Sequence, residues 1–319
     1  MPDAERQIVA FYNLENFFDT VDDPLKDDNE FLPCSLKDWS EQRYLEKLEN
    51  ITSSISSIDQ NRVPAIIGVS EVENKTVLTD LLYQPPFNRA YDYVHYDSLD
   101  KRGMDVALLY DRNIFRVLSQ DVFRVVLETN ENYTTRDILY VKGAFEGDDI
   151  VHFFVNHWPS RREGTRKTMP RRIAAARSLA AKTQKILQDY PQAKIVIMGD
   201  FNDLPVSKSI SRYLNSKSQR DIKRDELYNL AFIPYSKKMG TVFAKGRWLM
   251  FDQIMISRGM MSAPGFRINS SRLTVHFDKR LLFYDKKRAI YRPNRSYSGK
   301  KYHGGFSDHL PVYVAMDRK

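Results

Sequence analysis

The chain has 319 residues, of which 42% are hydrophobic and 12% are aromatic. This content is enough for a packed core and argues against an intrinsically disordered protein. No apolar run approaches the roughly 18 residues that a membrane-spanning helix needs, and the formal net charge of +8 suits a polyanionic partner without requiring one.

The cellular compartment is suggested by cysteine usage and by the start of the chain. The single cysteine, Cys34, excludes an internal disulfide framework and fits a reducing compartment. The first residues lead straight into strand-like sequence with no signal-peptide core. We therefore expect a cytoplasmic protein, a monomer without stable membrane association. A signal peptide that had been removed would leave no trace, so a secreted or periplasmic location stays open.

Buried strands and two long helices follow one another along the chain. Residues 7–12 and 65–69 read as buried strands on either side of a helix over residues 40–58, whose apolar residues recur every three or four positions. The next four strands come in quick succession, and the turns between them favour antiparallel pairing. They are expected at residues 105–110, 116–126, 137–145 and 150–155.

The second long helix is predicted over residues 170–187, with Pro170 in its first turn, where a missing N–H costs little. A strand over residues 195–198 and short helices come next. The remaining strands are expected at residues 251–257, 272–277 and 312–315. Because no repeat, low-complexity linker or composition break interrupts the chain, we predict a single α/β domain over residues 1–319 with two mixed sheets and helices outside.

Polar clusters stand where several of the apolar strands end or begin. Ligands and catalytic groups of α/β proteins collect at the C-terminal ends of strands, so clusters far apart in the chain predict a composite active site. Three such clusters are Asn156-His157, Asp200-Phe201-Asn202 and Asp308-His309.

Two further strand ends carry oxygen ligands. Asn13 ends the first strand and Glu71 follows the second. Amide and carboxylate oxygens suit Mg²⁺ or Mn²⁺. Taken alone, Glu71 could equally be an acid that stabilises a helix start. Because Asn13, Asp200 and Asp308 stand at other strand ends, we favour a metal site.

This set of residues lacks an obvious covalent nucleophile and suits attack of water on a phosphoester. Asp200 and Asn202 can direct the water and the phosphoryl oxygens. His309, paired with the carboxylate of Asp252, can act at the phosphate, and His157 is the predicted acid for the leaving group.

Taken together and in order, these motifs resemble the endonuclease/exonuclease/phosphatase superfamily over nearly the whole chain. The resemblance implies a four-layer α/β sandwich of the deoxyribonuclease type, in which two facing mixed sheets are flanked by helices. It also implies that Asn13 and Glu71 bind the metal, and that Asp308 is a metal ligand or an orienting carboxylate. Two departures are Tyr12 and Ser70, which stand where many members have Trp and Gln; neither removes a ligand.

The most economical function is that of a metal-dependent phosphodiester hydrolase, a nuclease, with DNA favoured over RNA. Residues 279–301 interleave lysines and arginines with aromatic residues, a combination that suits nucleic acid. A solvated surface loop explains this segment equally well. Candidate substrate contacts nearer the predicted site are Arg102, Arg161 and Asn156.

Two alternatives stay open. The same fold could act on a phospholipid, an inositol phosphate or another small phosphoester, and the arginines near the site would serve such substrates equally. A catalytically silent phosphate- or nucleic-acid-binding module is the second alternative. Such a module would normally have lost part of the catalytic set, and none of that set is missing here: Glu71, Asp200, Asn202, Asp252 and His309.

Overall fold

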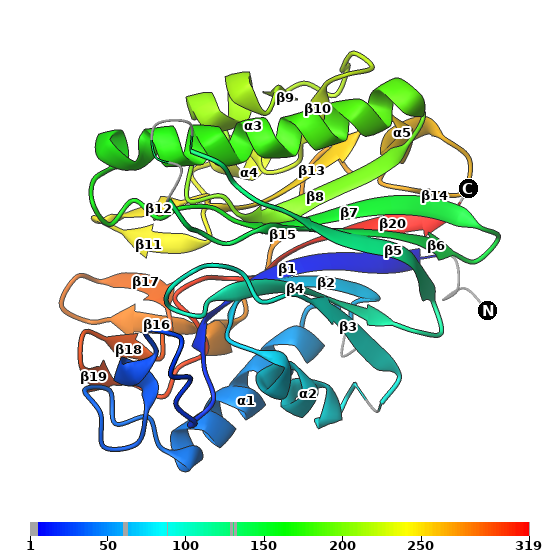
Figure 1. Ribbon diagram of the computed structural model, residues 1–319. Helices are drawn as coiled ribbons and strands as arrows, with labels where there is room; N and C mark the ends of the chain where they lie inside the picture. Colours follow the sequence, from blue (N-terminus) through cyan, green and yellow to red (C-terminus); the bar gives the residue numbers. More distant parts are fainter. Residues whose placement is uncertain (1–5, 60–62, 88, 128–129, 131–132, 319) are drawn as a thin grey trace.

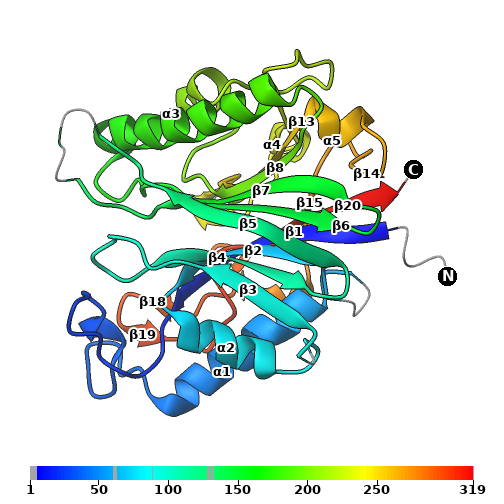
Figure 2. The same ribbon diagram turned by 45° about the vertical axis from the view of Figure 1, so that its right-hand side comes forward.

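The computed structural model describes residues 6–59, 63–87, 89–127, 130 and 133–318. Two seven-stranded sheets lie face to face, and helices cover the outer face of each sheet (Figure 1). The four-layer order of helices, sheet, sheet and helix is also clear in the turned view (Figure 2). The fold predicted from the sequence is therefore confirmed.

The first sheet has the strand order β14-β20-β1-β2-β4-β3, with β15 paired to β20. Only β1 and β2 are parallel neighbours in it; the other pairs are antiparallel. Its strands are β1 (Arg6–Phe17), β2 (Ile66–Val72), β3 (Tyr91–His95), β4 (Asp105–Asp111), β14 (Phe266–Arg267), β15 (Thr274–Val275) and β20 (Val312–Arg318).

The second sheet has the order β5-β6-β7-β8-β13-β10-β9. Here β7 runs parallel to β8, and β13 runs antiparallel to β8. Its strands are β5 (Phe115–Phe123), β6 (Ile138–Phe145), β7 (Asp149–His157), β8 (Lys194–Asp200), β9 (Ser216–Lys217), β10 (Leu227–Asn229) and β13 (Asp252–Ser257).

Helices and hairpins complete the fold. Asn74 caps α2 by accepting hydrogen bonds from the backbone N–H groups of Thr76 and Val77. The helices are α1 (Glu41–Ser56), α2 (Lys75–Tyr83), α3 (Thr165–Asp189), α4 (Phe232–Ser236) and α5 (Arg258–Ser262). Three hairpins lie outside the sheets: β11–β12 (Val242–Ala244 and Arg247–Leu249), β16–β17 (Leu282–Asp285 and Ile290–Pro293) and β18–β19 (Tyr297–Ser298 and Lys301–Tyr302).

Three apolar clusters hold the layers together. The largest fills the space between the sheets and includes Phe11 of β1 and Met198 of β8. A second joins the first sheet to α1 and α2, and a third joins the second sheet to α3. Strands buried on both faces explain why the sequences of β1, β2 and β8 are almost continuously apolar.

The second long helix begins earlier than the sequence pattern predicts. It starts at Thr165, so Pro170 lies inside α3 and not in its first turn. Because Pro170 has no N–H to donate, side chains must supply hydrogen bonds to carbonyl groups at the start of α3. The buried Arg172 donates to the carbonyl of Thr165 (3.0 Å), and the Thr168 hydroxyl donates to the carbonyl of Gly164 (2.8 Å).

The strand predicted over residues 272–277 is also wrong in length, because β15 comprises only Thr274 and Val275. Its pairing with β20 ends where His276 meets Pro311, which has no N–H for the next ladder bond. The other expected strands and the first long helix are present within a few residues of their predicted bounds.

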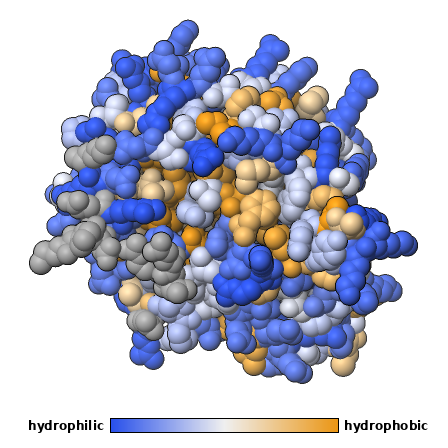
Figure 3. All heavy atoms as spheres, turned by 180° about the vertical axis from the view of Figure 1, so that it is seen from behind, coloured by the Kyte–Doolittle hydropathy of each residue, from blue (hydrophilic) through white to orange (hydrophobic). Residues whose placement is uncertain are grey.

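The start of β1 and the end of β20, which pair with each other, lie at one end of the sheets, and the C-terminal ends of β1, β2, β7 and β8 lie at the other, on the left of Figure 1. Seen from behind, apolar residues gather near the middle of the face, with hydrophilic residues around them (Figure 3). Among the described residues, no helix is both long and apolar enough to cross a membrane.

Candidate active site at the strand ends

The carboxylate of Asp200 is the centre of the polar cluster at this end of the sheets. Its Oδ2 accepts from the side-chain amides of Asn13 (3.1 Å) and Asn202 (3.3 Å). The same oxygen lies 3.6 Å from Nε2 of His157 and 3.8 Å from Nε2 of His309. Five residues predicted for the site, drawn from both sheets, therefore meet around a single buried oxygen.

Strand register brings these groups together. His157 and Asp252 are both paired with Asp200, so three side chains of β7, β8 and β13 stand in one row. Gly199 allows the close approach of β7, because a Cβ there would lie 2.3 Å from the carbonyl oxygen of Asn156.

The first sheet presents its two predicted metal ligands on distorted strand ends. The pairing of β1 with β2 shifts register after Asn13, and β2 shifts against β4 around Glu71. Glu71 (φ 60°), Glu15 (52°) and Asn16 (51°) have left-handed backbone, and so does Asn202 (48°), which lies just beyond β8. Bulges re-aim side chains, and backbone strain of this kind clusters at functional sites. Here it directs the Glu71 carboxylate to within hydrogen-bonding distance of Asn13 Nδ2 (3.2 Å).

His309 is held by Asp252, as the sequence predicts. Its Nδ1 lies 2.7 Å from Asp252 Oδ2, and both residues are buried. Burial alone would lower the pKa of His309, but Asp252 and Asp200 hold that pKa well above its usual value. The ring is thus kept protonated, with Nδ1 donating to Asp252 and Nε2 turned toward Asp200.

His157 has a different environment. Nη2 of the buried Arg136 lies 2.9 Å from His157 Nε2, and Nη1 of the same guanidinium donates to Asp100 Oδ2 (3.1 Å). Burial lowers the pKa of His157 well below its usual value, and the charges of Arg136 and Arg102 lower it further. In the free protein His157 is therefore neutral, so these charges do not favour the acid role assigned to it from sequence, which stays a prediction.

Charge at the centre of the site suits a divalent cation. Burial raises the pKa of Asp200 to about 7, with Asp252 and Glu71 contributing in the same direction and the charge of His309 opposing them. Ligand atoms of Asp200, Asp252 and His309 lie within 4.8 Å of one another, and Asp252 Oδ1 is buried without a hydrogen-bond partner among the described residues. A cluster with this excess of buried carboxylate fits a hard divalent ion.

The other predicted site residues fall into two groups. Arg102 and Asp308 border the cluster. The positive charge of Arg102 lowers the pKa of His157, and Asp308 Oδ1 lies 3.9 Å from His309 Nε2. Arg161 is committed to the protein, since it contacts Asp203 and donates to the carbonyl of Asn202 (2.6 Å). Its expected contact with substrate gains no support from this geometry.

The predicted role of Asn156 in substrate binding stays a prediction that the geometry does not favour. Asn156 is fully buried. Its Nδ2 donates to the carbonyl of Met198 (3.2 Å), and its Oδ1 accepts from the indole of Trp158 (3.1 Å). The side chain therefore ties β7 to β8 and orients Trp158, and both of its polar ends are used inside the protein.

Sequence reasoning missed the support around the site. Arg136 and Asp100 belong to no recognisable motif, so no local signal could have identified their contact with His157. Glu15, in contrast, was not missed: it stands two residues after Asn13, where the family resemblance implies an acid near the metal. The buried Glu15 carboxylate accepts from the backbone of Ser296 (2.7 Å) and lies 3.4 Å from Nε of Arg295, which also donates to Asp308 (3.0 Å).

Replacing Arg136 by glutamine is expected to raise the pKa of His157, because the positive charge beside the ring is removed. Titration of the ring resonances by NMR measures this change. His152 is a control within the same spectrum: burial lowers its pKa as well, with Lys142 and Lys182 as the charges acting on it. An unchanged His157 titration in the variant would show that Arg136 does not set the charge of this histidine.

Comparison with known proteins concerns the family and the fold. Residues 8–318 match the Endonuclease/Exonuclease/phosphatase family. A search among curated protein sequences gave no match.

Several solved structures share the fold. Humanized D. rerio TDP2 is 12% identical, covering 98% of this chain and 99% of that one, with a TM-score of 0.59. The mannosyl-6-phosphatase of Bacteroides thetaiotaomicron is 17% identical, with coverage of 97% and 99% and a TM-score of 0.58. The human Nocturnin catalytic domain is 16% identical, with coverage of 98% and 95% and a TM-score of 0.55.

At these identities the solved structures establish the fold, while the family match covers nearly the whole chain. The predicted resemblance is confirmed. The chain belongs to the endonuclease/exonuclease/phosphatase family of divalent-metal-dependent phosphoesterases, and it is a hydrolase of phosphoester bonds.

Proposed function

We propose that this protein is a phosphodiesterase that cleaves nucleic acid, DNA in preference to RNA, with Mg²⁺ or Mn²⁺ as the metal. The observation that carries the proposal is the position of the cationic, aromatic hairpin β16–β17 beside the catalytic cluster. Two of the similar structures, TDP2 and Nocturnin, belong to the same family, but the substrate of this chain has to be argued from its own surface.

The proposed mechanism uses each group as it is placed. Glu71 and Asn13, beside Asp200, would hold the metal, which supplies positive charge for the phosphoryl oxygens and the leaving oxygen. Asp200 accepts the proton of the attacking water, and Asn202 positions that water. Protonated His309 donates from Nε2 to a phosphoryl oxygen as negative charge builds up there.

The hairpin β16–β17 is joined to the site by the chain itself. Two residues beyond β17, Arg295 pairs with Asp308, the neighbour of His309. The adjacent hairpin β11–β12 makes a bridge from Val242 to His309. Because these two neighbouring segments contact the site, we infer that side chains on β16–β17 lie at its rim.

The surface of this hairpin suits a polyanion with aromatic bases. Tyr284 and Tyr291 are paired across the two strands, with ring centroids 4.9 Å apart, and both are exposed. Lys286 and Lys287 are exposed in the turn between the strands. Stacking platforms next to cations are how proteins bind unpaired nucleic-acid strands. The alternative of a solvated surface loop stays open, because Tyr284 and Tyr291 are exposed whereas Tyr297 is buried in the cluster that joins the first sheet to α1 and α2.

Replacing Lys286 and Lys287 by alanine is expected to raise the Michaelis constant for oligonucleotides and to flatten its salt dependence. Each phosphate that the protein no longer neutralises should remove about 0.9 from the slope of log affinity against log salt on duplex DNA, or about 0.7 on a single strand. Hydrolysis of a small aryl phosphodiester should be nearly unchanged, because the catalytic cluster is untouched.

The matched control replaces Lys223 and Arg224, two exposed cations on the loop before β10, in the second sheet. That variant removes the same charge but should keep the salt slope of the unmodified protein. Equal slopes in both variants would mean that β16–β17 does not contact the nucleic-acid backbone.

A parallel assay tests the proposed function itself. The purified protein is given duplex DNA, single-stranded DNA, RNA, bis-p-nitrophenyl phosphate, inositol phosphates and sphingomyelin, with and without Mg²⁺ or Mn²⁺. Cleavage of DNA at the highest kcat/KM, dependent on added metal, is the expected result. Preference for any non-nucleic-acid substrate would contradict the proposal.

The second candidate is hydrolysis of a small phosphoester, the activity named for the structurally similar mannosyl-6-phosphatase. Arg102 and Arg295 favour it, because both border the cluster and their side chains are partly exposed. Two such cations could hold a terminal phosphate group. Turnover of inositol or sugar phosphates above that of oligonucleotides would support this candidate.

A further inference from the structure

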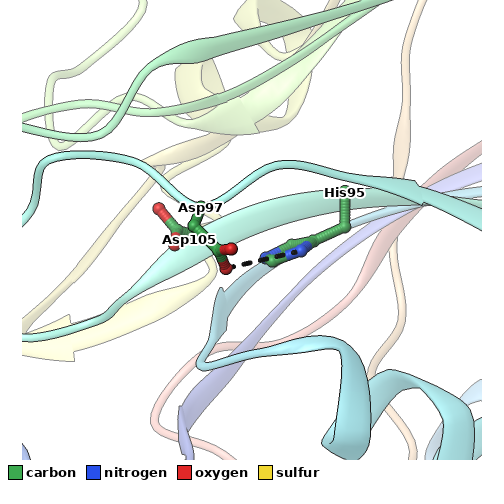
Figure 4. Close-up of side chains that lie close together, drawn as sticks. All are labelled: His95, Asp97 and Asp105. Carbon is green, nitrogen blue, oxygen red and sulfur yellow. Dashed lines mark ion pairs between the residues drawn. The ribbon is translucent and has the colours of Figure 1, made fainter. Parts of the chain in front are cut away.

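A second group of metal-ligating side chains lies away from the catalytic cluster, at the base of the loop between β3 and β4. His95 ends β3, Asp105 begins β4, and Asp97 lies in the loop between them (Figure 4). One ligand atom from each of the three residues lies within 4.8 Å of the others. The imidazole points toward the two carboxylates (Figure 4), and its Nδ1 is 4.0 Å from Asp97 Oδ1.

His95 is poorly satisfied by the protein alone. Its side chain is 0% exposed, and neither ring nitrogen has a hydrogen-bond partner among the described residues. A buried polar group without a partner costs about 1–3 kcal/mol, so such a ring calls for an explanation. A ligand bound between the imidazole and the carboxylates would satisfy it.

The donors select the class of ligand. Imidazole nitrogen is a good ligand for Zn²⁺ and similar transition metals, whereas Mg²⁺ and Ca²⁺ prefer sites made wholly of oxygen. Three protein ligands leave one tetrahedral position for water, which is reachable because the Asp97 side chain is 66% exposed. Ligands of a tetrahedral zinc lie about 3.3 Å apart, and the exposed Asp97 can rotate to approach that spacing.

The charges around the three residues also bear on which class of ion the site binds. Asp97 and Asp105 bring two negative charges, and Asp100 is close enough to act on Asp105. Lys26 and Lys75 oppose them, since both act on His95. With cations nearby, charge attraction alone gives a weak site. Tight binding must therefore come from the coordinate bond to the imidazole, which again favours a transition metal over Ca²⁺ or Mg²⁺.

We propose that His95, Asp97 and Asp105 bind a second divalent ion, of the Zn²⁺ class, separate from the metal at Glu71. The site ties together both ends of the loop over residues 96–104. Asp105 already accepts from the backbone N–H of Ser98 (3.2 Å to each oxygen). The same loop carries Asp100, which contacts Arg136. The ion is thus a structural clamp for the segment that supports His157.

Two titrations of the metal-free protein test this site. Zn²⁺ binding is measured by calorimetry, and Co²⁺ binding is measured by visible absorption. The Glu71→Gln variant should keep one Zn²⁺-binding event, with the Co²⁺ bands of a tetrahedral nitrogen- and oxygen-ligated ion. His95→Gln should lose that event. Asp97→Asn should weaken Zn²⁺ by more than about tenfold, since even outer-sphere changes cost 10- to 100-fold in affinity.

The control is His303→Gln, which removes an exposed histidine and should bind Zn²⁺ like the unmodified protein. Circular dichroism checks folding, and Asp97→Asn provides a surface variant should the buried His95 variant fail to fold. The proposal is overturned if Asp97→Asn keeps the full Zn²⁺ affinity. It is also overturned if a folded His95→Gln retains the event seen in Glu71→Gln, or if Glu71→Gln abolishes all Zn²⁺ binding.

Discussion

Replacing His309 by alanine is expected to lower the turnover number about 10²- to 10⁴-fold, the usual loss when a positioned acid or base is removed. The ring is held 2.7 Å from Asp252, and its pKa is well above its usual value despite burial. The variant loses the protonated donor that faces Asp200. Steady-state kinetics on an aryl phosphodiester measure the loss without interference from the nucleic-acid surface.

The same assay shows whether Asp252 acts through His309. Asp252→Asn should lower turnover because its amide cannot hold the imidazolium as the carboxylate does. In the double variant the second substitution should add little, as for residues that work as one unit. His276→Ala is a control, since the ring of His276 is hydrogen-bonded to the hydroxyl of Ser57, away from the cluster. A double variant with the product of both single losses would show that the two residues act independently.

Substitution of Glu71 by glutamine is expected to abolish measurable hydrolysis and to weaken Mg²⁺ or Mn²⁺ by more than about 100-fold, beyond the cost of an outer-sphere change. Glutamine has nearly the same shape as glutamate. The Glu71 carboxylate accepts from the backbone N–H of Asn16 (2.9 Å) and from Asn13 Nδ2 (3.2 Å), and the glutamine oxygen can still accept one of these bonds, so the fold should survive. Calorimetric titration and turnover, measured on the same preparation, test both losses.

Glu163→Gln is the matched control, because this exposed acid just before α3 pairs with Arg171 and Lys167 away from the site. It should bind the catalytic metal and turn over normally. Should Glu71→Gln bind Mg²⁺ and hydrolyse substrate as well as the control, Glu71 is not a metal ligand. The Zn²⁺ clamp at His95 would be unaffected by that outcome, since it uses other residues.

Much of the architecture was readable from local sequence. Strands such as β8 are buried on both faces, which forces a continuous apolar run ending at Gly199-Asp200. The amphipathic spacing of α1 likewise follows from its contact with a single sheet face. Because strand ends are marked by the change from apolar to polar residues, the main catalytic candidates could be named before their geometry was known.

Local sequence misled where backbone groups find partners far away. Arg172 and Thr168 support carbonyls near the start of α3, so the helix extends ahead of Pro170. Asn156 stands in a catalytic-looking motif, yet its amide donates to the carbonyl of Met198 in β8 and accepts from the indole of Trp158. Neither outcome follows from propensity, because each depends on a particular hydrogen bond that the folded chain makes.

The sequence by itself determined the layers, the strand ends and the residue types that gather there, since these follow from burial patterns a few residues long. Only the tertiary structure decided which oxygen lies at the centre, that Arg136 lies against His157, and that His95 faces two carboxylates. Strand register and sheet packing set these distances, and a shift of one residue would turn each side chain to the opposite face.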